Sequence, residues 1–502
     1  MLQTLLHNNR LYTRRLFLFS CLVSGLLFPF SYAPYHHYWL VFVLLPWMFL
    51  LSWQQTPKIA FMRGWVFGFG WFFHGVFWIN YSLHEHGSAP LFLSVLMIAL
   101  LSAYLALFPA LAFYLSRRFK LHSAALQLII YLPAWLVLLE WLRGYFLTGF
   151  PWLQPGYALV DTPLAGYAPV IGGLGVTGIL AVIAGAISYA LLYKKWVAPL
   201  VMILLLVVVG LLLQDIDWSH PEGKPVKISM IQGNIPQSDK WKYEMHEPTM
   251  AMYAQLTQQH WDSDLIIWPE TAIPDFAHRV PFFLRQLKTK AELHDTDVVF
   301  GVFVQGENKR NYYNAMVSIR DGVYKKRHLV PLGEFIPMRG ILDVFRRWIK
   351  IPMSDVAEGP QQQPLITGAG KKLGMNICFE DAFDRDIIRD LPEADILVNV
   401  SNDAWFEDSD EPWQHHQIAR MRALEAGRYL LRSTNTGVSA VIDPKGEVLA
   451  MSPQFKRDVL TYEVYGMRGE TPYAIWKNYL LISVCLMLLG GLWYQQQRMH
   501  KS

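Results

Sequence analysis

Eight long apolar runs occupy the two ends of this chain and limit what it can fold into. A run of about 20 apolar residues has the length of a helix that crosses the hydrocarbon core of a bilayer. The runs predict membrane-spanning helices at Leu16–Phe30, Trp39–Trp53, Ile59–Ile79, Pro90–Leu115, Leu126–Trp141, Ala165–Tyr193, Trp196–Leu213 and Tyr473–Tyr494. The first two are shorter than the usual crossing length, so a re-entrant pair is an alternative there.

Lysine and arginine mark alternate ends of these runs. They gather at Arg10, Arg14 and Arg15, at Lys58 and Arg63, at Arg117, Arg118 and Lys120, at Lys194 and Lys195, and at Arg498 and Lys501. The loops between these positions are nearly free of them, as in SYAPYHHY and NYSLHEHGSA. Basic loops stay on the cytoplasmic side of a membrane. The pattern therefore predicts eight spans with both termini in the cytoplasm and residues 214–472 outside it.

The first run also has features of a cleaved signal peptide, namely a basic start, a short apolar stretch and SYA. Further spans follow at once, and Pro34 comes just after the small residue, which favours a retained helix. The net charge of +4 is too small to indicate a nucleic-acid partner, so we assign the basic residues to membrane topology.

Residues 214–472 have a different pattern, in which short apolar runs alternate with helical ones. We predict strands at 226–232, 264–269, 297–304, 312–319, 372–379, 394–401 and 438–444, and helices at 246–260 and 413–430. Many of the runs are apolar on both faces, as in sheets covered on both sides. The organisation expected is a membrane domain of seven helices (1–213), an α/β or α+β domain (214–472), and a last helix with a cytoplasmic tail (473–502).

Three predicted strand ends carry residues capable of nucleophilic chemistry. Glu270 ends DLIIWPE, Lys326 and Glu334 lie in YKKRHLVPLGEF, and Cys378 and Glu380 lie in KLGMNICFED. A cysteine attacks as a thiolate and needs a base or a cation beside it, and a lysine can stabilise an oxyanion. Each residue alone has a structural explanation: a small core side chain, a helix cap or a solvated lysine. No spacing rule links them, so the pattern suggests a site without proving one.

Six segments of the polar region resemble, in order, motifs of the nitrilase (carbon-nitrogen hydrolase) superfamily. They are IQGNIPQSDKW (231–241), WPETAIP (268–274), KRHLVPLGEFIP (326–337), NICFED (376–381), SNDAWF (401–406) and RSTNTGVSAVIDPKG (432–446). The membrane half adds EWLRG (140–144) and TGFPWLQPGY (148–157). With these, the chain resembles the membrane branch of the superfamily, the bacterial apolipoprotein N-acyltransferases. Leu332 and Phe379 depart from the usual phenylalanine and tyrosine.

The resemblance implies a fold, a reaction and a place in the cell. The fold is a polytopic helical domain carrying an α-β-β-α sandwich. The reaction is N-acylation of the S-diacylglyceryl cysteine of an apolipoprotein with the sn-1 chain of a phospholipid, typically phosphatidylethanolamine. It runs through a ping-pong thioester and needs no metal or cofactor. Glu270, Lys326 and Cys378 would form the catalytic triad, and Glu334, Glu380 and Trp241 would support it. The site would face the periplasm from the inner membrane.

Several alternatives remain open from the sequence. A membrane-tethered amidase would use the same triad with water as the acceptor. A transporter would need charged residues along its spans, which are not evident here. His415 and His416 suggest a metal, but the sequence places no further His or Cys at ligand spacing near them. Glu140 and Arg143, three apart on a predicted helix, can pair and support either a lipid groove or the structure.

Overall fold

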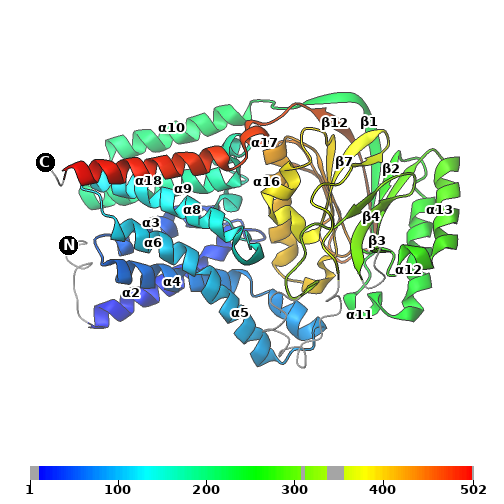
Figure 1. Ribbon diagram of the computed structural model, residues 1–502, viewed down its shortest axis with the longest axis horizontal. Coiled ribbons are helices and arrows are strands. Elements are labelled where there is room, and N and C mark those ends of the chain that lie inside the picture. The colour runs from blue at the N-terminus through cyan, green and yellow to red at the C-terminus, as the bar shows by residue number, and fades with distance from the viewer. Residues whose placement is uncertain (1–10, 307–310, 336–355, 500–502) are drawn as a thin grey trace. The chain divides into compact units, whose positions relative to one another are not determined.

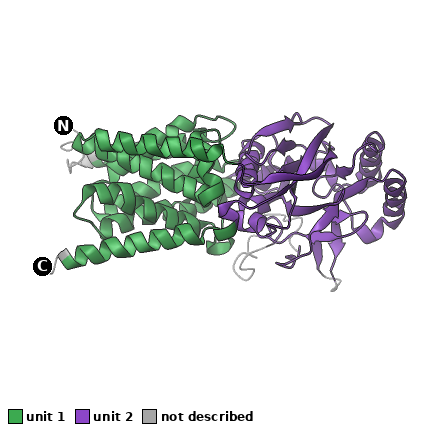
Figure 2. Cartoon of the chain, turned by 90° about the horizontal axis from the view of Figure 1, so that it is seen from above, with its two compact units in different colours: residues 1–78, 92–216, 475–502 green, residues 79–91, 217–474 purple. Residues whose placement is uncertain are grey.

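The computed structural model describes residues 11–306, 311–335 and 356–499, which form two compact units (Figure 2). Unit 1 comprises residues 1–78, 92–216 and 475–502, and unit 2 comprises residues 79–91 and 217–474. Residues 79–91, which include the loop predicted between the spans Ile59–Ile79 and Pro90–Leu115, therefore group with unit 2. Of the predicted features, Arg10, Lys501 and the end of the segment 326–337 lie outside the described residues.

Unit 1 is helical, and helices cover all eight predicted spans (Figure 1). The helices are α2 (Leu11–Leu27), α3 (Val41–Ser52), α4 (Pro57–Gly75), α5 (Leu91–Leu105), α6 (Leu107–Arg118), α7 (Ala124–Leu126), α8 (Leu132–Arg143), α9 (Ala168–Tyr193), α10 (Val197–Gln214) and α18 (Tyr479–Met499). Among the described residues, six helical stretches are long and apolar enough to cross a membrane, and α3 is a shorter apolar helix. The count agrees roughly with the predicted eight.

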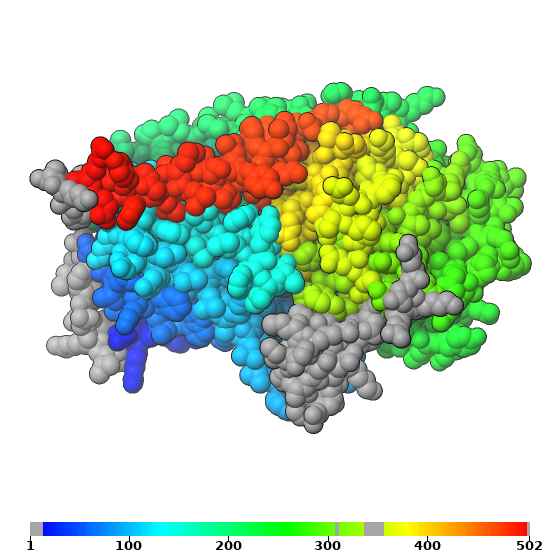
Figure 3. Space-filling model, in the orientation of Figure 1, coloured from blue at the N-terminus to red at the C-terminus, as the bar shows by residue number. Residues whose placement is uncertain are grey.

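The helices α10 and α18 leave apolar side chains exposed along their length. In α10 only Pro199 and Gly210 are buried among the described residues. In α18, which is red in Figure 3, the exposed side chains include Leu486, Met487 and Trp493. Apolar helices with uncovered faces belong in lipid, where every backbone group is satisfied within the helix. These two helices are thus suited to the bilayer.

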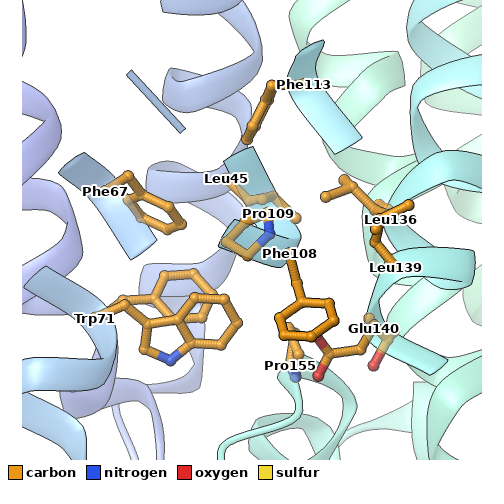
Figure 4. A pocket seen from close by; sticks show the side chains of 13 residues that line it. Leu45, Phe67, Trp71, Phe108, Pro109, Phe113, Leu136, Leu139, Glu140 and Pro155 are labelled. Atoms are coloured by element: carbon orange, nitrogen blue, oxygen red, sulfur yellow. The ribbon is translucent and has the colours of Figure 1, made fainter. Parts of the chain in front are cut away.

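A buried ion pair fixes the end of α8. Arg143 is fully buried, and its guanidinium pairs with Glu140, as the three-residue spacing predicts. It also donates to the carbonyl oxygens of Phe150 and Trp152, at 2.9 Å for the latter. Glu140 borders a cavity of about 40 Å³ and is the only charged residue among its described lining residues (Figure 4). Arg143 therefore joins α8 to the segment that follows it.

We expect Arg143→Met to destabilise unit 1 by about 3 kcal/mol, because it removes the partner of the half-buried Glu140 carboxylate and of two carbonyl groups. Thermal unfolding in detergent measures this, with the exposed Lys120→Met as the control. The charge-swapped variant Glu140→Arg/Arg143→Glu should not recover the loss, since a glutamate cannot donate to the two carbonyls. Full recovery by the swap would contradict the role assigned to these carbonyl contacts.

Unit 2 contains two six-stranded sheets. The first has the order β12-β1-β2-β3-β4-β5, and the second has the order β11-β10-β9-β8-β7-β6. The first sheet comprises β1 (His220–Gln232), β2 (Leu265–Ile267), β3 (Asp297–Gln305), β4 (Tyr312–Ser318), β5 (Val323–Lys325) and β12 (Asp458–Arg468). The second comprises β6 (Ile366–Gly368), β7 (Lys371–Ile377), β8 (Ile396–Ser401), β9 (Leu430–Thr434), β10 (Ala440–Ile442) and β11 (Val448–Met451).

The alternation of side chains along the strands builds four layers, α-β-β-α. Leu265 and Ile267 of β2 share one buried core with Ile396 and Val398 of β8, so the two sheets pack face to face. Ile266, between the two β2 residues, enters a second core instead. That core includes residues of α12 (Tyr243–Gln258) and α13 (Pro281–Leu293), which cover the outer face of the first sheet (Figure 1).

Helices α15 (Asp384–Ile388) and α16 (Glu411–Ala426) cover the outer face of the second sheet in the same way. The period of two in a strand sends neighbouring residues to opposite faces, so strands buried on both sides need apolar residues at both. The predicted sandwich is confirmed. The other helices described in unit 2 are short: η3 (Tyr81–His86), α11 (Gln237–Lys240), η8 (Ala277–Arg279), η10 (Cys378–Ala382) and η11 (Asp403–Phe406), with α17 (Pro472–Trp476) at its C-terminal boundary.

Candidate active site

Glu270 lies just beyond β2, where Pro269 interrupts the apolar run. Its side chain is buried and held on both oxygens. Oε1 accepts a hydrogen bond from the Asn314 amide of β4 at 2.7 Å, and Oε2 accepts one from the main-chain N–H of Asn402 at 2.9 Å. Two fixed donors orient the carboxylate and leave it capable of accepting a proton from a neighbour.

Lys326 follows β5 and brings a cation to the same place. Its ammonium nitrogen lies 2.9 Å from Oε1 of Glu334 and 3.7 Å from Oε1 of Glu270. Asn314 also donates to Glu334, at 3.2 Å. Burial alone would lower the pKa of Lys326, but the Glu334 and Glu270 carboxylates outweigh it and hold this pKa above its usual value. Lys326 is therefore a fixed positive charge between two carboxylates.

Cys378 begins η10, directly after β7. Its φ is +53°, in the left-handed region, and its partly buried side chain packs against the core between the sheets. Burial raises the pKa of the thiol to about 12, and the Glu270 carboxylate adds to this while the Lys326 ammonium opposes it. The resting thiol is therefore neutral at physiological pH, so an attack needs a base that removes the proton.

Glu380 joins the lysine segment to the cysteine strand. One of its oxygens accepts from the main-chain N–H groups of Arg327 at 2.5 Å and His328 at 3.0 Å. The other accepts from the Tyr324 hydroxyl at 2.8 Å and the Ile377 N–H at 2.6 Å. The side chain is completely buried. Its hydrogen bonds reach both the segment that follows Lys326 and the strand that precedes Cys378. Glu380 fixes the spacing between Lys326 and Cys378.

Two family models match the two halves of the chain. The family model for the apolipoprotein N-acyltransferase N-terminal domain matches residues 24–186, and the model for carbon-nitrogen hydrolase matches residues 227–473. A relative from Methylococcus capsulatus named apolipoprotein N-acyltransferase is 42% identical over 482 residues, covering 95% of this chain and 96% of the relative. The chain belongs to the apolipoprotein N-acyltransferase family.

Other similar proteins are also known. An apolipoprotein N-acyltransferase from Coxiella burnetii is 37% identical over 475 residues, covering 93% of this chain and 98% of the relative. Among solved structures, the carbon-nitrogen hydrolase from Helicobacter pylori G27 is 19% identical, with a TM-score of 0.36. The match covers 48% of this chain and 89% of that chain.

Trp241 lies at the edge of the candidate site, beside Phe303 and Lys240. Its ring stacks on Phe303 of β3, with centroids 5.6 Å apart, and the Lys240 ammonium lies 5.9 Å from its centroid. Lys240 is buried and donates to the Glu270 carbonyl at 3.1 Å. Burial lowers the pKa of Lys240 to about 8, against the Glu270 and Cys378 charges, which raise it. Trp241 thus adjoins a lysine that supports Glu270.

The sequence analysis missed three asparagines that contact Glu270 or Cys378 in the candidate site. Asn314 interrupts an apolar strand, and Asn402 lies in the SNDAWF segment. Asn399 donates to the Cys378 carbonyl at 3.2 Å from within the apolar strand β8. For Asn314 and Asn399 the available signal was a polar residue inside an apolar strand, because a buried amide needs partners. Asn402 acts on Glu270 through its main-chain N–H, for which the residue type gives no signal.

The structure gathers around His415 a set of groups that the sequence could not reveal. Asp403 and Glu411 bring carboxylate oxygens within 4.8 Å of its ring nitrogens, in a geometry open to a metal. However, the Arg432 guanidinium already donates to Asp403 at 2.7 Å, and His415 lies 2.7 Å from Asp381. The Asp403 and Asp381 carboxylates are therefore already paired with side chains of the protein, Arg432 and His415.

Proposed function

We propose that this chain transfers an acyl group from a phospholipid to the N-terminal amine of an S-diacylglyceryl cysteine on an apolipoprotein. The observation that carries the proposal is the near full-length match to relatives named for this activity. The arrangement of Glu270, Lys326 and Cys378 supports it, because it supplies a base, a cation and a nucleophile in one buried place. The apolar helices give access to lipid substrates.

In the first half-reaction, Glu270 accepts the proton of the Cys378 thiol as the sulfur attacks the sn-1 ester carbonyl. The carbonyl oxygen gains a negative charge, which the Lys326 ammonium stabilises. The ester C–O bond then breaks, and the proton held by Glu270 passes to the departing alkoxide. The lysophospholipid leaves, and an acyl thioester remains on Cys378.

In the second half-reaction, the amine of the lipidated cysteine attacks the thioester. Glu270 accepts a proton from the amine, the C–S bond breaks, and the proton returns to the Cys378 sulfur. The products are an N-acylated lipoprotein and the free enzyme. Glu334 and Glu380 act by holding Lys326 and its segment in place, and Trp241 borders the substrate path.

The proposed location is the bacterial inner membrane. Residues 1–213 and 473–502 would span or flank the bilayer with both termini in the cytoplasm, and residues 214–472 would lie in the periplasm. The alternation of basic loops supports this orientation. Phosphatidylethanolamine is the proposed donor. A tethered amidase is not favoured, because it would have no use for the matched membrane domain.

Intact mass spectrometry of the purified protein after incubation with phosphatidylethanolamine tests the proposal. We expect a gain of one acyl chain that hydroxylamine removes and that a diacylglyceryl peptide discharges. The adduct should be absent in Cys378→Ala and present in the matched control Cys21→Ala, whose thiol lies in α2. No adduct, with lipid shown to be bound and the Cys378 thiol shown to be free, would overturn the mechanism.

A further inference from the structure

A layer of buried polar side chains lies behind Cys378, on the outer face of the second sheet. Asn376, Asn399 and Arg432 are register partners on β7, β8 and β9. Their neighbours Ile377, Val400 and Leu431 point to the opposite face, into the core between the sheets. Polar groups in such a place are costly to bury unless every one is paired. The layer therefore calls for a role beyond packing.

His415 of α16 completes this layer and reaches the nucleophile. Its Nε2 lies 2.7 Å from Oδ1 of Asp381 and 3.2 Å from the main-chain oxygen of Cys378. The Asn399 amide donates to the same oxygen at 3.2 Å, and the Arg432 guanidinium fixes Asn399 at 2.7 Å. The Cys378 carbonyl oxygen is thus held by hydrogen bonds from two completely buried side chains, His415 and Asn399.

These two hydrogen bonds hold the carbonyl of a residue whose backbone is strained. The backbone of Cys378 has a φ of +53°. Residues other than glycine rarely adopt this conformation, so the surrounding structure must stabilise it. Non-glycine residues in this region cluster at functional sites. A carbonyl held from behind by His415 and Asn399 cannot rotate back to the extended conformation of β7.

The charges around His415 favour its doubly protonated form. Its ring faces carboxylates from three elements, Asp381 of η10, Asp403 of η11 at 3.5 Å and Glu411 of α16 at 3.4 Å, and the Arg432 guanidinium of β9. Burial and Arg432 lower the pKa of His415, but Asp381 and Asp403 outweigh them and hold it well above its usual value. These groups therefore favour a positive charge on the ring that contacts the Cys378 carbonyl.

We propose that His415 is a positioning residue for the nucleophile: as an imidazolium it holds the Cys378 carbonyl together with Asn399 and favours the thiolate as the sulfur gives up its proton. The inference rests on the proposed role of Cys378 as nucleophile. The contact of His415 with Cys378 is at the main-chain oxygen of that residue. His415 acts through the backbone and through its charge, which lowers the pKa of the thiol against the larger effect of burial.

The rate of alkylation of Cys378 by iodoacetamide, followed by peptide mass spectrometry across pH, tests this without any lipid. His415→Gln keeps an N–H donor but loses the charge. We expect its alkylation at pH 8 to be about tenfold slower, which corresponds to a thiol pKa about one higher. The control His416→Gln replaces the next residue, which points about 100° away around α16, and should react like the wild type.

A folded His415→Gln protein with the wild-type alkylation profile would overturn the inference. The same result leaves the acyl-transfer proposal intact, because that proposal is judged by the thioester adduct. A second measurement needs no variant. At pH 8.5 ordinary histidines are neutral, so 15N spectra of histidine-labelled protein should retain a doubly protonated ring. Its complete absence would also overturn the inference.

Discussion

Lys326→Met should abolish acyl-enzyme formation and also destabilise unit 2. The ammonium lies between two buried carboxylates, 2.9 Å from Glu334 and 3.7 Å from Glu270. Removal of one partner from a buried charge cluster costs about 3–5 kcal/mol, because the remaining charges stay desolvated. Loss of an oxyanion partner alone reduces kcat by about 10²–10³. Intact mass and thermal unfolding in detergent measure the two effects separately.

Two further variants separate stability from chemistry at this position. Lys326→Met/Glu334→Gln removes one of the stranded charges and should recover part of the lost stability without recovering activity. Lys325→Met changes the preceding lysine, whose ammonium lies over the Tyr313 ring, and should retain both. Because the pKa of Lys326 is raised in the folded state, its stabilisation is fully present below about pH 10.4 and is lost only at more alkaline pH. Normal thioester formation by Lys326→Met would refute the assigned role.

Glu380→Gln should reduce acyl-enzyme formation by about 10²-fold, although the side chain keeps its size. Each carboxylate oxygen accepts a main-chain N–H, from Arg327 or from Ile377, and an amide nitrogen cannot accept either of them. One buried N–H would then be left without a partner, at a cost of about 1–3 kcal/mol. The lysine segment would shift relative to Cys378, and a displacement of about 1 Å can cost 10²-fold in rate.

The pH dependence of stability checks the same substitution. Burial raises the pKa of Glu380 to about 7, from about 4.3 in an unfolded chain. The protonated acid therefore favours folding, and this contribution is lost as the pH rises from about 4.3 through about 7. The unfolding midpoint should vary less over this range in Glu380→Gln than in the wild type. The exposed Glu393→Gln should leave that dependence unchanged, and an unaltered profile in Glu380→Gln would contradict the assigned burial effect.

The sequence predicted the strands that have a continuous apolar signal and missed the others. All seven predicted strands are present, whereas β5 and β6 have three residues each and lack a detectable period. The strand β9 was not predicted, and its first residue, Leu430, was included in the helix predicted at 413–430. That helix ends at Ala426 because Gly427 adopts the left-handed conformation, with a φ of +61°. The glycine was the signal for the helix end, and the apolar residues beyond it hid the change to strand.

The residues proposed to carry the chemistry were recognisable in the sequence, but the groups that contact them in the structure were not. Glu270, Lys326 and Cys378 are recognisable as reactive types at strand ends. Asn314, Asn402 and His415 reach them from distant positions, and no local pattern encodes a contact between residues that far apart. The interpretation of Glu380 changes most: its position beside the nucleophile suggests a chemical role, while its four contacts make it a link between segments.

Because the site is divided between the two sheets, it can form only at a late stage of folding, when the sheets pack against each other. Glu270 and Lys326 follow strands of the first sheet, and Cys378 follows a strand of the second. In a chain whose sheets have not yet packed together, the Cys378 thiol lies away from Glu270, its proposed base. Once they have closed, the raised pKa of the Cys378 thiol keeps the sulfur protonated, and in the proposed mechanism Glu270 takes the proton only when a substrate carbonyl is attacked. Protonated thiols resist oxidation, so the folded protein is expected to protect the proposed nucleophile between reactions.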